Sequence, residues 1–105
     1  MNIKPSDIEP YLLLIDNYIK LKNYSMAETL INDAENYHSK DFRVLERKLN
    51  IELLNNRNTE ARRTINSIKA LDSKNYFANY AEGLLNERMG YYKTAMTLYE
   101  RAIII

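Results

Sequence analysis

The sequence has no cysteine, and its 105 residues include only two glycines and two prolines. Without cysteine the chain can form neither disulfides nor thiolate metal sites, although this does not decide its redox compartment. So few glycines and prolines argue against a β-rich fold, which needs many tight turns. The apolar fraction of 46% and the charged fraction of 28% are close to those of soluble globular domains. The composition therefore predicts a single all-α domain.

The chain also lacks a surplus of either charge, because 15 Lys and Arg stand against 14 Asp and Glu and the net charge is +1. Nucleic-acid-binding proteins usually carry a basic surplus, since contacts to phosphates supply much of their affinity. The apolar run Tyr11–Ile15 is far too short to span a bilayer. No signal peptide is visible at Met1–Asp7. The expected compartment is the cytoplasm by default, or the periplasm if the chain is a processed fragment.

An internal repeat with a period of about 34 residues runs through the sequence. When residues 8–41, 42–75 and 76–105 are superposed without gaps, Ala27, Ala61 and Ala95 fall in one column. Three further columns each take one residue from every segment: Tyr24, Asn58 and Tyr92; Ile31, Ile65 and Tyr99; Ala34, Ile68 and Ala102. This agreement without an insertion predicts three copies of one structural unit.

Each unit is predicted to consist of two amphipathic helices. In the first unit, Tyr11, Leu14, Ile15 and Tyr18 follow the spacing of one buried helix face. Ser25 and Glu28 have capping-box spacing, which supports the start of a helix there. Turns are expected near residues 22–23, 55–57 and 89–90, where Asn and Gly tolerate a left-handed backbone. The predicted helices span residues 8–22, 25–37, 42–55, 59–71, 76–89 and 91–105.

A two-helix unit of this length resembles the tetratricopeptide repeat, abbreviated TPR. The third unit matches the family's signature best, and the middle unit is degenerate, with Lys48, Glu52 and Asn58 at positions that are usually apolar or aromatic. The matching residues of the third unit are Gly83, Gly90, Tyr92, Ala95, Tyr99 and Ala102. The resemblance implies an all-α, TPR-type α-solenoid, which is a right-handed superhelix of antiparallel helix hairpins.

The expected organisation is a lead-in at residues 1–7 that resembles the tail of a preceding repeat, followed by repeats at 8–41, 42–75 and 76–105. The third repeat is expected to be truncated, because the sequence stops at Ile105 inside an expected helix. Its outer face, with Met96, Tyr99 and Ile103, would be exposed. Since exposed apolar patches commonly mediate association, we expect self-association through this C-terminal face.

No catalytic, phosphate-binding or metal-binding motif occurs in the sequence, and we predict a protein that is not an enzyme and needs no cofactor. The single histidine, His38, is expected at a solvated helix end. Five tyrosines at signature columns are expected in the core: Tyr11, Tyr18, Tyr24, Tyr92 and Tyr99.

Arg57, Arg62 and Arg63 form a small basic cluster in the second repeat. Such a cluster is commonly the solvated back of a helix. It could also contact nucleic acid or an acidic partner, and both interpretations remain open.

The resemblance further implies that the first helix of each unit lines a concave groove that binds a peptide or helix of a partner protein. Exposed aromatic and Arg side chains are enriched at such binding sites. The expected groove residues are Leu12, Asp16 and Ile19 in the first unit, Arg43, Glu46, Arg47 and Asn50 in the second, and Phe77, Tyr80, Leu84 and Arg88 in the third.

The predicted function is a protein–protein interaction scaffold, for which the resemblance suggests a place in a larger assembly such as secretion or pilus machinery. The alternative is a nucleic-acid-binding helical repeat, which the net charge of +1 disfavours.

Overall fold

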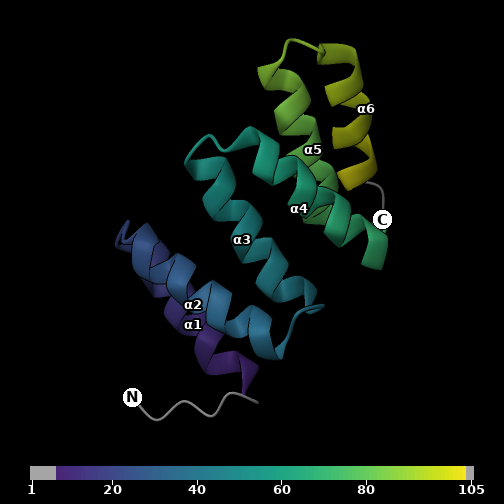
Figure 1. Ribbon diagram of the computed structural model, residues 1–105. Coiled ribbons are helices and arrows are strands. Elements are labelled where there is room, and N and C mark those ends of the chain that lie inside the picture. The colour runs from purple at the N-terminus through teal and green to yellow at the C-terminus, as the bar shows by residue number, and fades with distance from the viewer. Residues whose placement is uncertain (1–6, 104–105) are drawn as a thin grey trace. The chain divides into compact units, whose positions relative to one another are not determined.

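The computed structural model describes residues 7–103, which form six α-helices and no strand (Figure 1). The all-α prediction is confirmed, and every helix begins within one residue of its predicted start. The predicted lead-in lies outside the described residues except for Asp7, and so do Ile104 and Ile105. The helices are α1 (Ile8–Lys20), α2 (Tyr24–Tyr37), α3 (Phe42–Leu54), α4 (Asn58–Leu71), α5 (Tyr76–Arg88) and α6 (Tyr92–Ile103).

The turns α1–α2, α3–α4 and α5–α6 repeat one geometry at intervals of one repeat length. Lys22, Asn56 and Gly90 have positive φ angles of 59°, 57° and 85°. In every turn the amide of this residue donates to the carbonyl three residues earlier, and the next amide donates to the carbonyl five residues before itself. These two hydrogen bonds form the Schellman motif, which satisfies carbonyls at a helix C-terminus. The predicted turn positions are confirmed, although Lys22 rather than Asn23 takes the left-handed conformation.

The connections α2–α3 and α4–α5 also correspond after one repeat length. The Asp41 carboxylate accepts a hydrogen bond of 2.9 Å from the amide of Arg43, and the Asn75 side chain accepts one of 2.9 Å from the amide of Ala78. Asp and Asn are preferred at this position because their side chains satisfy free amides of the first helical turn. Asp41 and Asn75 are the last residues of the first two superposed segments, and each precedes the start of a helix.

The predicted capping box at Ser25 is wrong. The N-cap of α2 is Asn23, whose side chain accepts a hydrogen bond of 3.3 Å from the amide of Met26. Lys22 takes the positive φ of the preceding turn, and Asn23 is the residue that directly precedes the helix. Ser25 lies inside the first turn of α2.

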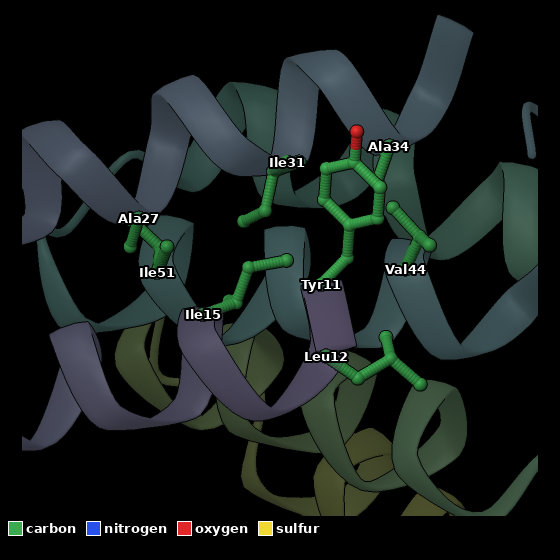
Figure 2. Packing of buried hydrophobic residues seen from close by; sticks show 8 residues of the cluster. All are labelled: Tyr11, Leu12, Ile15, Ala27, Ile31, Ala34, Val44 and Ile51. Atoms are coloured by element: carbon green, nitrogen blue, oxygen red, sulfur yellow. The ribbon is translucent and has the colours of Figure 1, made fainter. Parts of the chain in front are cut away.

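The chain divides into two compact units, of which the first ends at Ile51 and the second begins at Glu52, both inside α3. In the first unit α1 packs against α2, and α3 contributes to the same core. Figure 2 shows this core, where Tyr11 and Ile15 extend from α1 toward α2. Tyr18 and Tyr24 pack against it as partly buried side chains. The buried members are Tyr11, Leu12, Ile15, Ala27, Ile31, Ala34, Val44 and Ile51.

In the second unit α5 packs against both α4 and α6. Ala61 of α4 and Ala95 of α6 are buried, as is Ala27 of α2 in the first unit, so all three members of the repeated alanine column pack in helix interfaces. Glu52 is also buried, and its carboxylate accepts a hydrogen bond of 2.7 Å from the Thr64 hydroxyl. A polar residue therefore occupies a buried position where the family resemblance implied an aromatic ring, and the hydrogen bond offsets part of its desolvation.

The prediction that five signature tyrosines are core residues is wrong for Tyr92. Tyr11 is buried and three others are partly buried, but the Tyr92 side chain is 65% exposed. Tyr92 is the first residue of α6, and α5 has already ended at Arg88. The ring therefore lies beside a turn, whereas α6 buries Ala95 and Leu98 further along.

Candidate binding surface

Two of the expected groove residues in α1 belong to the interior of the first unit. Leu12 is only 3% exposed and is a member of the core cluster, so its predicted role in partner binding is wrong. Ile19 packs against the same cluster. Leu12 is buried because α3 contributes Val44 and Ile51 to this core. These residues cover a part of α1 that the sequence pattern assigned to the exposed groove.

Asp16 and Arg47, two more expected groove residues, bind each other. The Nε and Nη2 atoms of Arg47 each donate to one Asp16 carboxylate oxygen at 2.9 Å, and Nη1 donates to the carbonyl of Arg43 at 3.1 Å. Such two-point contacts between guanidinium and carboxylate are stronger than single ion pairs. Most donors of Arg47 are therefore used inside the first unit.

Arg43 is paired in a similar way. It donates to Asp41 at 2.9 Å and to Glu9 at 3.0 Å. The hydrogen bond from Arg43 lowers the pKa of Asp41 below its ordinary value, and Asp41 in turn raises the pKa of Arg43. The Arg43–Glu9 and Arg47–Asp16 pairs therefore join α1 to α3 by charged groups of opposite sign.

Two of the expected groove residues of α5, Phe77 and Tyr80, form a cluster of aromatic rings with Tyr76. The Tyr76 and Tyr80 rings are nearly parallel, with centroids 6.3 Å apart, and the Phe77 ring is also 6.3 Å from Tyr80. Tyr76 is 62% exposed and Tyr80 is 40% exposed, whereas Phe77 is partly buried. Residues four apart on a helix are surface neighbours, which explains the Tyr76–Tyr80 stack. We call Tyr76, Phe77 and Tyr80 the α5 aromatic surface.

Tyr99 of α6 supports this surface from the neighbouring helix. Its ring centroid is 6.0 Å from that of Tyr80, and its hydroxyl donates to Glu87 at 2.9 Å. Burial raises the pKa of Tyr99 to about 12, and the hydrogen bond to Glu87 acts in the same direction. Tyr80 therefore also packs within its own hairpin, because its ring lies between Tyr99 and the two other aromatic residues of α5.

Arg88, the last expected groove residue, has a structural role in the second unit. It donates to the Asn58 side chain at 3.0 Å and to the carbonyl of Leu53 at 3.3 Å. These bonds tie the end of α5 to the α3–α4 turn. The remaining expected residues, Glu46, Asn50 and Leu84, are partly buried.

Sequence reasoning missed Tyr76 and the acidic partner Glu9. Tyr76 could have been found because it lies four residues before Tyr80, on the same helix face. Glu9 lies one repeat length before Arg43 and thus occupies the same repeat column. Neighbouring repeats place equivalent positions close together, so opposite charges in one column indicate a pair.

Within residues 7–103, no group of three or more His, Asp or Glu side chains could hold a metal ion. No helix in this part of the chain is long and apolar enough to cross a membrane. His38 ends α2 as its C-cap residue and is partly buried. The Tyr76–Phe77–Tyr80 cluster is the strongest candidate binding surface in the described residues.

The chain matches no protein-family model and no curated protein.

Proposed function

We propose that this chain is a non-enzymatic protein-interaction module of TPR type, and that the α5 aromatic surface lies in the groove that binds a peptide or helix of a partner protein. The TPR assignment is supported by Schellman turns and helix starts that recur after one repeat length. This period and the two-helix unit are those of the TPR.

The observation that carries the functional proposal is the exposed and ordered aromatic cluster of α5. Tyr76 and Tyr80 remain 62% and 40% exposed although each ring is in contact with another ring. Tyrosine is enriched at binding hot spots because it buries a large area with few rotatable bonds. Rings already held by their neighbours lose less conformational entropy when a partner binds.

The charges on α3 support a protein partner over nucleic acid. Arg43 and Arg47 are paired with carboxylates, and Lys48 lies 3.2 Å from Glu35. Phosphates would have to compete with these carboxylates for the same cations, whereas nucleic-acid affinity depends on cations that phosphates can neutralise. An apolar peptide surface can dock on the aromatic rings without breaking an ion pair.

The test begins with a peptide selected from a displayed library against the immobilised chain. Its affinity for wild-type and variant proteins is then measured by fluorescence anisotropy. We expect Tyr76→Ala and Tyr80→Ala each to weaken binding by about tenfold, the effect of losing a hot-spot side chain. Tyr76→Ala is the cleaner variant, because Tyr80 also contacts Tyr99 across the hairpin.

Tyr37→Ala is the matched control, because Tyr37 is 60% exposed and lies on α2 in the first unit. Circular dichroism verifies that every variant remains helical. If the selected peptide bound Tyr76→Ala, Tyr80→Ala and Tyr37→Ala with equal affinity, the α5 aromatic surface would not be the binding site.

A further inference from the structure

In the second unit, side-chain contacts connect the α3–α4 turn to the α5–α6 turn. Arg88, at the end of α5, donates to Asn58 at the start of α4. Arg62 of α4 places its Nη2 atom 3.9 Å from the sulfur of Met89. The α3–α4 turn and the α5–α6 turn therefore lie next to each other.

This junction concentrates positive charge. The segments 57–63 and 86–93 contain five cations and two carboxylates, a net charge of +3 in a chain whose total is +1. One of the two carboxylates, Glu87, already accepts a hydrogen bond from Tyr99. All five cations are exposed, namely Arg57, Arg62, Arg63, Arg88 and Lys93.

Exposed apolar side chains stand among these cations. Met89, Tyr91 and Tyr92 are 49%, 60% and 65% exposed. We define the turn-end patch as the six exposed residues of this junction that the contacts and the α5–α6 turn bring together: Arg62, Arg88, Met89, Tyr91, Tyr92 and Lys93. It is separate from the α5 aromatic surface, because Tyr76 and Arg88 lie at opposite ends of α5, about 18 Å apart at the rise of an α-helix.

We propose that the turn-end patch is a second binding site, and that its ligand is an acidic segment of a partner protein in which Asp and Glu flank an apolar side chain. The cations match carboxylates, while the tyrosine rings and the methionine match the apolar group between them. A short acidic segment needs only the few cations present here. Nucleic acid fits less well, because its affinity depends on many phosphate contacts and the rest of the chain supplies no excess of positive charge.

The test uses the full chain and a fluorescein-labelled peptide in which Glu and Asp alternate with Leu and Phe. Two comparison probes are the same peptide with Gln and Asn for the acids, and a uridine oligonucleotide of similar charge. Anisotropy titrations at low salt should give saturable binding of the acidic peptide and much weaker binding of both comparison probes. We expect the affinity to fall as salt is added, since exposed charges are screened.

The Arg62→Glu/Lys93→Glu double variant should weaken acidic-peptide binding by about tenfold, because it reverses two exposed charges of the patch. Arg101→Glu is the control, since Arg101 is exposed in the last turn of α6 and should change the affinity by less than about twofold. A thermal melt checks the fold of each variant, and the neutral Arg62→Gln/Lys93→Gln variant replaces the double reversal if the latter unfolds.

Equal affinity of wild-type and double variant would overturn the proposal, as would equal binding of the acidic and amide peptides or tighter binding of the oligonucleotide. Tyr76→Ala should leave acidic-peptide binding unchanged. This result separates the turn-end patch from the α5 aromatic surface, so that either proposal can fail alone.

Discussion

Gly83 permits the closest approach between α5 and the ring that supports the aromatic surface. A Cβ atom at this position would lie 2.7 Å and 2.8 Å from two ring carbons of Tyr99. The ring contacts Tyr80 and its hydroxyl binds Glu87, so it cannot move without losing these contacts. Gly83 is therefore required for packing, although glycine inside a helix is itself unfavourable.

Replacing Gly83 by Ala is expected to lower the free energy of unfolding by about 1–2 kcal/mol, because overpacking against Tyr99 outweighs the better helix propensity of alanine. In a Tyr99→Ala background the same substitution should raise the free energy of unfolding by about 0.5–1 kcal/mol, since only the propensity gain remains. Urea denaturation of the four proteins measures both effects. The same sign in both backgrounds would show that Tyr99 does not set the requirement for glycine.

Individual side chains were the hardest feature to predict from the sequence. The pattern placed Asp16 and Arg47 on the groove-lining side but could not show that they bind each other, because this depends on how α1 and α3 are spaced. Leu12 was assigned to the surface for the same reason, since α3 provides two residues of the core that buries it. Both depend on packing between helices far apart in the sequence.

The helices and their turns, in contrast, follow from local sequence signals. Apolar periodicity and the repeat period gave all six helix starts within one residue. The turns were predicted from Asn and Gly, yet the first places Lys22 at a φ of 59°, which is unfavourable for a residue with a Cβ atom. The two hydrogen bonds of the Schellman motif hold Lys22 at this positive φ. The turn therefore overrides the preference of a residue with a Cβ atom for negative φ.

Lys22→Gly should raise the free energy of unfolding by about 0.5–1 kcal/mol, because glycine adopts positive φ without steric cost. Gly90→Ala should lower it by about 1 kcal/mol. Apart from Gly90 and its two chain neighbours, no atom lies within 4 Å of the Cβ position at Gly90, so the latter cost comes from backbone conformation alone. Urea denaturation at neutral pH measures both variants. A stabilising Gly90→Ala, or a destabilising Lys22→Gly, would contradict the assignment of these residues to equivalent turns.

At the scale of the whole molecule, the repeats and the compact units do not share their boundaries. The predicted repeats meet where α3 and α5 begin, whereas the compact units separate inside α3, between Ile51 and Glu52. The reason is that α3 serves both units: Ile51 belongs to the core with α1 and α2, and Glu52 binds Thr64 of α4.

The expectation that the C-terminal face is apolar and exposed is confirmed for two of its three residues. Met96 is 60% exposed and Ile103 is 72% exposed, whereas Tyr99 is partly buried. Self-association through this face stays a prediction, because exposure alone does not identify what covers a surface.

The central claim of protein binding through the α5 aromatic surface is tested most directly by nuclear magnetic resonance. Amide chemical shifts of the ¹⁵N-labelled chain are followed while the peptide selected from the library is added. We predict that the largest shift changes fall on Tyr76, Phe77 and Tyr80, with smaller ones at Tyr99, which supports them from α6. Saturable changes confined to α2 and α4, with the α5 amides unmoved, would contradict the account.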